Sequence, residues 1–182
     1  MYWSTVMNFV NCTAEDLKAI FGEEGIQMIS EYPDLLVVFA KKGDYPDVDK
    51  EYTPALFVSN LDEETFEVRY DASKPLGIVI YPEGVEAVMA NIPAYMYKRY
   101  KMSLLVHELV HVRQAKEGRI ECVSMDENIW EGELVKTKIE DYFSFPWEFE
   151  AFVEQYTYLT GCAVTGKKMA EEQKKTLVSK PA

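Results

Sequence analysis

The chain has 182 residues, of which 48% are hydrophobic and 13% aromatic. This composition supports a folded core in about one domain and excludes a wholly disordered protein. The 19 basic and 31 acidic residues leave a net charge of −12, which disfavours phosphate backbones and anionic membranes. We therefore expect no nucleic-acid partner and no membrane partner, and solubility explains the charge more simply than a basic partner does.

The N-terminal segment has no basic region followed by a long apolar stretch, so it predicts no secretory signal. The longest apolar runs, such as residues 35–40, are too short to cross a bilayer. The three cysteines, Cys12, Cys122 and Cys162, form neither a CxxC pair nor a disulfide framework. Free thiols are typical of a reducing compartment, and we expect a cytoplasmic protein.

The first half of the chain combines one capped helix with several strands. Thr13 before AEDLKAIF predicts a helix with a side-chain N-cap. A polar loop is predicted at 41–54 and a short helix at 83–92. Apolar runs predict strands at 34–40, 55–59, 65–70 and 77–81, of which the second and third form a hairpin.

The second half contains two strong helices. Pro93 and Gly118 bound the first, and Pro146 and Gly161 bound the second. Between them, RIECVS and NIWEGELV predict two short strands. We expect one domain over 1–165 and a polar, loosely ordered tail over 166–182. This order predicts an α+β fold in which helices pack on one face of a small, mainly antiparallel sheet.

The sequence HELVH at 107–111 contains the only two histidines of the chain. Histidines at positions i and i+4 lie one turn apart on one helix face, so both imidazoles can reach one zinc ion. Glu108 lies beside that ion without binding it, and can act as general base toward a metal-activated water.

The rest of this helix agrees with the motif. Its apolar residues fall opposite the histidines, so that one face predicts core and the other a polar cleft wall. A chance match to the motif would give no reason for the two histidines to lie opposite the apolar face of the helix. The apolar residues are Met102, Leu105, Val106, Leu109, Val110 and Val112.

A catalytic zinc needs a third protein ligand, and no third histidine exists. The second helix opens with Glu148 and Glu150, and Cys122 is a weaker candidate. At about 100° per residue, Glu148 lies at the edge of the apolar face of this helix, whereas Glu150 lies on the side expected to see solvent. We therefore predict Glu148 as the third ligand.

Three stretches, HELVHVRQ at 107–114, WEG at 130–132 and YFSFPWEFEA at 142–151, resemble small bacterial and phage metallopeptidase-like proteins of the gluzincin type. The segment that contains these stretches, 107–151, covers about a quarter of the chain. The resemblance implies a zincin-like fold, peptide-bond hydrolysis, and zinc ligands at His107, His111 and Glu148. Two features depart from the family: His111 and Glu148 are 148 − 111 = 37 positions apart, and Phe152 stands where the family places an aspartate that orients the first histidine.

Tyr142, Tyr156 and Tyr158 are candidates to donate a hydrogen bond to the developing oxyanion. Most of the 12 tyrosines must serve packing, and Tyr142 is the preferred candidate because it lies in the matching stretch.

The expected function is zinc-dependent hydrolysis of a peptide or protein substrate. The alternative is a catalytically silent metallopeptidase-like protein that acts by protein–protein contact. A protein that has lost catalytic activity need not keep Glu108, so the presence of this residue argues against the alternative. An acidic inhibitor or DNA mimic would rest on the net charge alone and would leave the HELVH register unexplained.

Overall fold

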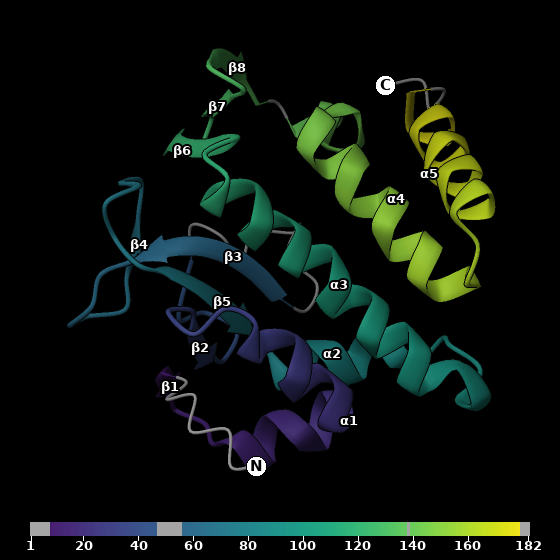
Figure 1. Cartoon of the computed structure of the whole chain (residues 1–182), viewed down its shortest axis with the longest axis horizontal. Coiled ribbons are helices and arrows are strands. Elements are labelled where there is room, and N and C mark those ends of the chain that lie inside the picture. The colour runs from purple at the N-terminus through teal and green to yellow at the C-terminus, as the bar shows by residue number, and fades with distance from the viewer. Residues whose placement is uncertain (1–7, 47–55, 138, 179–182) are drawn as a thin grey trace. The chain divides into compact units, whose positions relative to one another are not determined.

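The computed structural model describes residues 8–46, 56–137 and 139–178 (Figure 1). The chain divides into two compact units, 1–105 and 106–182, so the expected single domain over 1–165 spans both. Residues 47–54 of the expected polar loop and 179–182 of the expected tail lie outside the described residues. None of the described helices is long and apolar enough to cross a membrane.

The first unit is built on a five-stranded sheet with the order β1-β2-β5-β3-β4. Strands β1, β2 and β5 run parallel, whereas β3 runs antiparallel to both β5 and β4. The sheet is therefore mixed, and the expectation of a mainly antiparallel sheet is wrong for this unit. Two parallel pairings cause this difference. The unpredicted strand β1 pairs with β2 after the chain returns through a helix, and β2 pairs with β5 although β3 and β4 lie between them in the sequence. The strands are β1 (Asn8–Val10), β2 (Leu36–Phe39), β3 (Leu56–Leu61), β4 (Val68–Arg69) and β5 (Leu76–Ile80).

Helix α1 (Ala14–Ser30) begins with the predicted N-cap. The Thr13 hydroxyl accepts a hydrogen bond from the Asp16 backbone N–H at 3.2 Å, and the Asp16 carboxylate accepts one from the Thr13 N–H at 2.8 Å. This reciprocal pair satisfies two donors that the first turn would otherwise leave free. Gly22, with φ of 73°, bends the helix in the middle.

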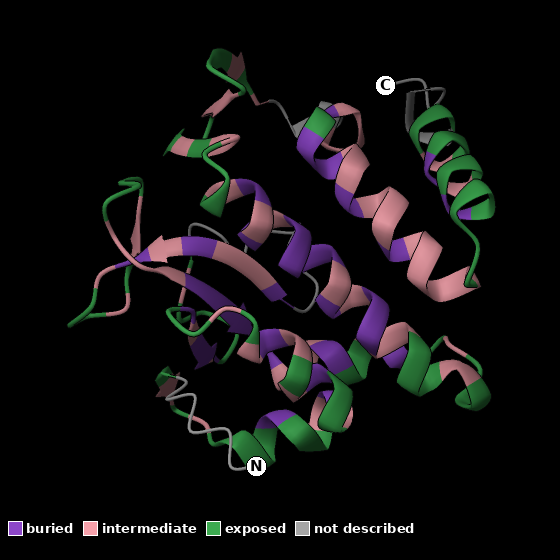
Figure 2. Ribbon diagram, in the orientation of Figure 1, coloured by how far each residue is buried: buried purple, intermediate pink, exposed green. Residues whose placement is uncertain are grey.

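The core of this unit follows the two-residue alternation of a strand. Strand β5 is mostly buried (Figure 2): Ile78 and Ile80 alternate with Val79, and Tyr81, which follows the strand, is buried as well. Val79 belongs to an apolar cluster with Val38 and residues of β3. The first unit also contains helix α2 (Pro82–Met89) and the 3-10 helix η1 (Ala94–Met96). Helix α3 (Tyr97–Lys116) begins in this unit and continues into the second.

In the second unit, α3 is followed by a three-stranded antiparallel sheet of β6 (Ile120–Ser124), β7 (Glu127–Trp130) and β8 (Glu133–Lys136). The sequence predicts two strands here, but the segment NIWEGELV folds as two by itself. Glu131 and Gly132 have φ of 51° and 88°, and a two-residue turn with positive φ at both positions reverses a hairpin.

The unit ends with the 3-10 helix η2 (Ile139–Ser144) and the helices α4 (Pro146–Thr160) and α5 (Ala163–Val178). Gly161 ends α4 in the left-handed conformation, with φ of 73°. The segment expected as a loose tail from residue 166 lies inside α5, which runs alongside α4 (Figure 1). Over 163–175, the part of α5 whose side chains are described, Gly166 and Ala170 are buried, and Gly166 lies against Thr157 of α4.

Candidate metal centre

Helix α3 brings the two histidines of the chain together. His107 and His111 lie one turn apart, and their Nε2 atoms are 3.2 Å from each other. The imidazole ring centroids are 4.9 Å apart with the ring planes at 80°. Both rings therefore direct one nitrogen toward the same small space.

The first turn of α4 adds a carboxylate to this space. Glu148 Oε2 lies 3.2 Å from His107 Nε2 and 3.5 Å from His111 Nε2. Pro146 is well suited to the first position of α4, where its missing N–H costs no helical hydrogen bond. The positive end of the helix dipole favours an acidic residue in this first turn, and Glu148 is that residue.

The triangle formed by these three atoms has the dimensions of a zinc site. Zinc binds nitrogen and oxygen ligands at about 2.0–2.1 Å in tetrahedral geometry, which places two ligands about 3.3–3.4 Å apart. The three observed edges, 3.2, 3.2 and 3.5 Å, lie around that value. Two imidazoles and one carboxylate, with a fourth position left over, form a known donor set of catalytic zinc. The residues present fit the ion.

A buried atom of this group is also short of a partner. Glu148 Oε2 is buried and has no well-aligned hydrogen bond within the described part of the chain. Buried carboxylate oxygens are nearly always satisfied, so an orphan at this point indicates a place for a cation. His107, His111 and Glu148 form a group whose ligand atoms all lie within 4.8 Å of one another.

The electrostatics of the group also favour a positive charge. Burial would raise the pKa of Glu148, but the two imidazoles, His111 above all, lower it well below its usual range. Burial would lower the pKa of His111, but the carboxylates of Glu148 and Glu108 outweigh it and raise that pKa. Burial lowers the pKa of His107. Without a metal ion, a proton on His111 therefore balances the ionised Glu148 at neutral pH.

Glu108 lies next to the group but is not one of its three members. Its side chain is buried, with the residue 9% exposed, and this burial raises its pKa to about 8. The charge of His111 lowers this pKa and that of Glu148 raises it, both less than burial does. A carboxyl with a pKa near neutral can take up and release a proton under physiological conditions, as a general base must.

The face of α3 that carries the histidines is more covered than the sequence predicts. His107 is 5% exposed, so this face does not form the wall of an open cleft. The ring of Phe152 on α4 lies against His107 at a centroid distance of 4.6 Å. The aromatic residue that stands in place of the family's aspartate thus covers the first histidine and cannot accept its proton.

The buried face of α4 also differs from the prediction. The apolar stripe predicts burial of Phe149, Phe152 and Val153, with Glu148 at the edge. These three are half-buried, because α4 has neighbours on several sides, including α5 at Thr157. The most buried residues of α4 are Trp147, Glu148, Ala151 and Gln155. Glu148 thus lies within the buried face.

The rejected ligand candidate Glu150 has another role. Arg119 contacts both of its carboxylate oxygens, at 3.0 and 2.8 Å, and Arg113 contacts one at 3.3 Å. Arg119 also pairs with Glu131 at 3.0 Å and lies over the ring of Trp130. Glu150 therefore connects α4 to α3 and to the β6–β8 sheet and is not part of the histidine group.

The structure places the three candidate tyrosines differently. Tyr142, in η2, interacts with the Glu148 side chain, and burial raises the pKa of its hydroxyl well above the usual value. Tyr156 donates a hydrogen bond to the Gln173 side chain of α5. Tyr158 also has an interaction partner. Tyr142 is thus the tyrosine that lies beside the group.

Cys122, the alternative third ligand, is half-buried in β6 and is not among the three residues of the group. Burial raises the pKa of its thiol, and the charges of Glu121 and Glu148 add to this effect. A thiol of raised pKa is a poor metal ligand at neutral pH, since the thiolate is the form that binds.

Gln114 is the residue of this centre whose role the motif does not reveal. Its Oε1 lies 2.9 Å from His111 Nδ1, and its Nε2 donates to the Trp147 carbonyl oxygen at 3.1 Å. The available sequence signal was its spacing, three positions after His111 on the same helix, which places the two side chains side by side.

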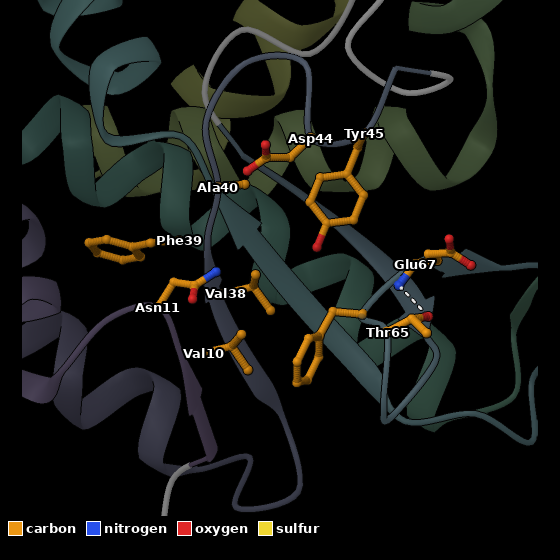
Figure 3. Close-up of a pocket in the computed structure, with 10 residues that line it drawn as sticks. Val10, Asn11, Val38, Phe39, Ala40, Asp44, Tyr45, Thr65 and Glu67 are labelled. Atoms are coloured by element: carbon orange, nitrogen blue, oxygen red, sulfur yellow. Dashed lines mark hydrogen bonds between the residues drawn. The ribbon is translucent and has the colours of Figure 1, made fainter.

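A cavity of about 270 Å³ lies in the first unit, and none of these residues lines it (Figure 3). It opens at the ends of β1 and β2, and its polar lining includes Asn11, Asp44 and Glu67. The hydrogen bond drawn in Figure 3 runs from the Glu67 backbone N–H to the Thr65 hydroxyl. The cavity contains none of the predicted site residues.

In comparisons with known proteins, no family model matches this chain, and no curated protein or solved structure matches it significantly.

Proposed function

We propose that this chain is a zinc-dependent peptidase of the gluzincin type, with a zincin-like fold and a peptide or protein substrate. His107, His111 and Glu148 would hold the ion, and the observation that carries the proposal is the triangle of their ligand atoms, with edges of 3.2, 3.2 and 3.5 Å. Zinc in such a site supplies Lewis acidity, which makes a bound water more acidic and polarises a carbonyl.

Glu108 is the proton carrier of the proposed reaction. It takes a proton from the attacking water while the water oxygen forms a bond to the carbonyl carbon of the peptide. As the carbon–nitrogen bond breaks, Glu108 delivers that proton to the leaving nitrogen. Burial raises its pKa to about 8 in the metal-free protein, and the positive charge of a bound ion would lower that pKa, so that the carboxylate that accepts the proton is available near neutral pH.

Tyr142 is proposed as the donor to the carbonyl oxygen as negative charge develops there. Its hydroxyl lies in the field of Glu148 and Glu108 and keeps its proton, since its pKa is raised. A neutral donor held in place before the reaction is what stabilises a developing oxyanion.

A second candidate function rests on the burial of the centre. His107 and Glu108 are only 5% and 9% exposed, which would suit a structural zinc in a binding protein that acts by contact. A structural site does not need Glu108, whereas the peptidase does. We propose the cytoplasm as the location for either function, and the free Cys12, Cys122 and Cys162 support this proposal.

Substitution of Glu108 separates the two candidates. We expect Glu108→Gln to keep about one zinc per chain, measured by plasma mass spectrometry after dialysis against a mild chelator. Cleavage of a peptide library, followed by mass spectrometry, should fall by about 10²–10⁴-fold. Glu133→Gln, an exposed change in β8, is the matched control. Undiminished cleavage by Glu108→Gln would refute the mechanism, and zinc binding without cleavage by the wild type would favour the binding protein.

A further inference from the structure

The nitrogen of His111 that faces away from the triangle is held by one buried side chain. Gln114 is 0% exposed, and its Oε1 lies 2.9 Å from His111 Nδ1. A histidine ligand usually gives its second N–H to an acceptor, which fixes the ring and the tautomer. In most sites this acceptor is a carboxylate, a carbonyl or a water, and here it is a side-chain amide.

The orientation of this amide follows from its second contact. The oxygen and nitrogen of a glutamine are assigned from their hydrogen-bond partners. The Trp147 carbonyl oxygen can only accept, so the Gln114 atom 3.1 Å from it must be the NH₂ nitrogen. The atom facing His111 is then the amide oxygen, which can only accept, and His111 Nδ1 must carry a proton. The lone pair of a neutral His111 is therefore on Nε2, the atom that faces His107 and Glu148.

The same amide joins the two helices that carry the ligands. Its oxygen contacts ligand His111 on α3, and its nitrogen contacts the residue that precedes ligand Glu148 on α4. Loss of this side chain would release both the ring of His111 and the first turn of α4. The buried Gln155 side chain interacts with His107, but His107 Nδ1 has no well-aligned hydrogen bond within the described ranges.

We propose that Gln114 is the positioning residue of the metal centre. It presents His111 Nε2 to the ion and holds the first turn of α4 so that Glu148 reaches the same ion. This inference rests on the zinc site of the proposed function but not on hydrolysis.

Two substitutions distinguish positioning from simple packing. Gln114→Leu removes both hydrogen bonds, and we expect it to weaken zinc binding by about 10–100-fold, the usual effect of losing such a contact. Gln114→Glu keeps an acceptor for His111 but loses the amide donor to Trp147. We therefore expect it to weaken zinc binding measurably, but less than Gln114→Leu does. Affinity is measured by competition with a chromogenic chelator. Gln173→Leu, which removes a half-buried glutamine from α5, is the matched control and should bind zinc as wild type does.

The wild-type protein provides a readout that needs no variant. Because the chain has only two histidines, ¹⁵N spectra of the zinc-loaded protein contain two imidazoles, and through-bond correlation of each ring with its assigned backbone amide distinguishes them. We expect a protonated Nδ1 and a metal-bound Nε2 at His111. Metal binding through His111 Nδ1 would overturn the inference even if Gln114→Leu failed to fold.

The outcomes for the two proposals are separable. Wild-type zinc affinity in a folded Gln114→Leu would overturn the positioning role and leave the peptidase proposal intact. A loss in Gln114→Glu as large as that in Gln114→Leu would overturn the part of the role that rests on the acceptor for His111. Zinc binding that depends on Gln114 without any peptide cleavage would refute the peptidase and keep the positioning role. A wild-type chain that binds no zinc would overturn both.

Discussion

Two glutamates in the first turns of α4 illustrate how closely spaced residues acquire different roles. Glu148 Oε2 lies within 3.5 Å of both histidines, whereas Glu150 is paired with Arg119 and Arg113. The dipole of the helix N-terminus acts on both and contributes less than about 1 kcal/mol, so it cannot distinguish them.

Alanine substitutions should reveal this difference. We expect Glu148→Ala to weaken zinc binding by orders of magnitude, because two ligands bind the ion far less well than three. Glu150→Ala should leave zinc affinity nearly unchanged and lower the thermal midpoint, since two arginines lose a partner. Chelator competition and thermal unfolding measure the two effects. Equal zinc affinity in the two variants would contradict the ligand assignment.

The raised pKa of Glu108 predicts how the stability of the metal-free protein depends on pH. Unfolded, this carboxyl has a pKa near 4.5, and folded it has one of about 8, so between these values only the folded state keeps the proton. Stability must then fall as pH rises through this window, by up to about 1.4 kcal/mol per pH unit. His111, whose pKa is also raised, acts in the same direction above 6.5, while Glu148 stays ionised and Tyr142 neutral.

Urea unfolding in the presence of a chelator tests this sign. Between pH 6.5 and 8, the free energy of unfolding should decline more steeply in wild type than in Glu108→Gln, which has no carboxyl to titrate at this position. His107, whose pKa is lowered in the folded state, still loses its unfolded-state proton around pH 6.5, but both proteins contain it, so it does not account for a difference between their slopes. Parallel slopes for the two proteins would show that Glu108 titrates normally in the folded state.

For individual residues, the sequence predicts positions best where both residues lie on one helix, because the helix determines the distance between them. The i, i+4 rule predicts that His107 and His111 lie together, and they do, at 3.2 Å between Nε2 atoms. The wheel of α4 also predicts that Glu148 faces the histidines more closely than Glu150. The role of Gln114 could not be predicted, because it depends on a carbonyl 33 positions further along the chain.

Helix α5 packs through small residues, which a search for large apolar side chains does not detect. Between residues 163 and 175, where the side chains of this helix are described, the buried positions are Gly166 and Ala170, one turn apart, and neither is large enough to register as an apolar face. Small residues instead let two helices approach closely, and Gly166 meets the backbone of Thr157. The sequence therefore predicts a loose tail where the structure has a packed helix. The extra strand in the β6–β8 sheet was overlooked for a similar reason, because Glu131-Gly132 is a weaker turn signal than Asn-Gly.

Gly166→Ala tests the close approach of the two helices. A Cβ atom at this position would lie 2.5 Å from the Thr157 backbone nitrogen, too close for the helices to keep their spacing. Overpacking of this kind costs about 1–3 kcal/mol, which exceeds the gain of about 1 kcal/mol that alanine brings to a helix. We expect net destabilisation in urea unfolding. Val164→Ala, at a position 81% exposed, is the control and should change stability little. A more stable Gly166→Ala would mean that helix propensity outweighs the contact.

For the whole molecule, the division into two units falls between Leu105 and Val106, inside α3. No loop or change in composition marks this point, since the helical pattern continues across it, and a sequence reading predicts one domain. Residues 107–148 contain every predicted zinc ligand, so the proposed centre belongs entirely to the second unit. Bound metal can therefore stabilise directly only the conformations that hold this unit together.

Hydrogen exchange should map this asymmetry. On removal of zinc, we expect faster amide exchange in the second half of α3 and in α4, and little change in β2 and β5 of the first unit. His111→Ala should exchange like the metal-free wild type whether or not zinc is added. A uniform change along the chain, or none at all, would contradict a centre confined to the second unit.

The proton that balances Glu148 in the metal-free centre has a consequence for any measurement of affinity. A divalent ion that enters must expel this proton from His111, so metal uptake acidifies an unbuffered solution. Titration heats then include the ionisation enthalpy of the buffer, and runs in phosphate and in Tris will differ by that amount per proton released. The apparent affinity for the metal ion increases with pH until His111 is already deprotonated in the metal-free protein. A dissociation constant for this centre is therefore a property of the protein together with its solution.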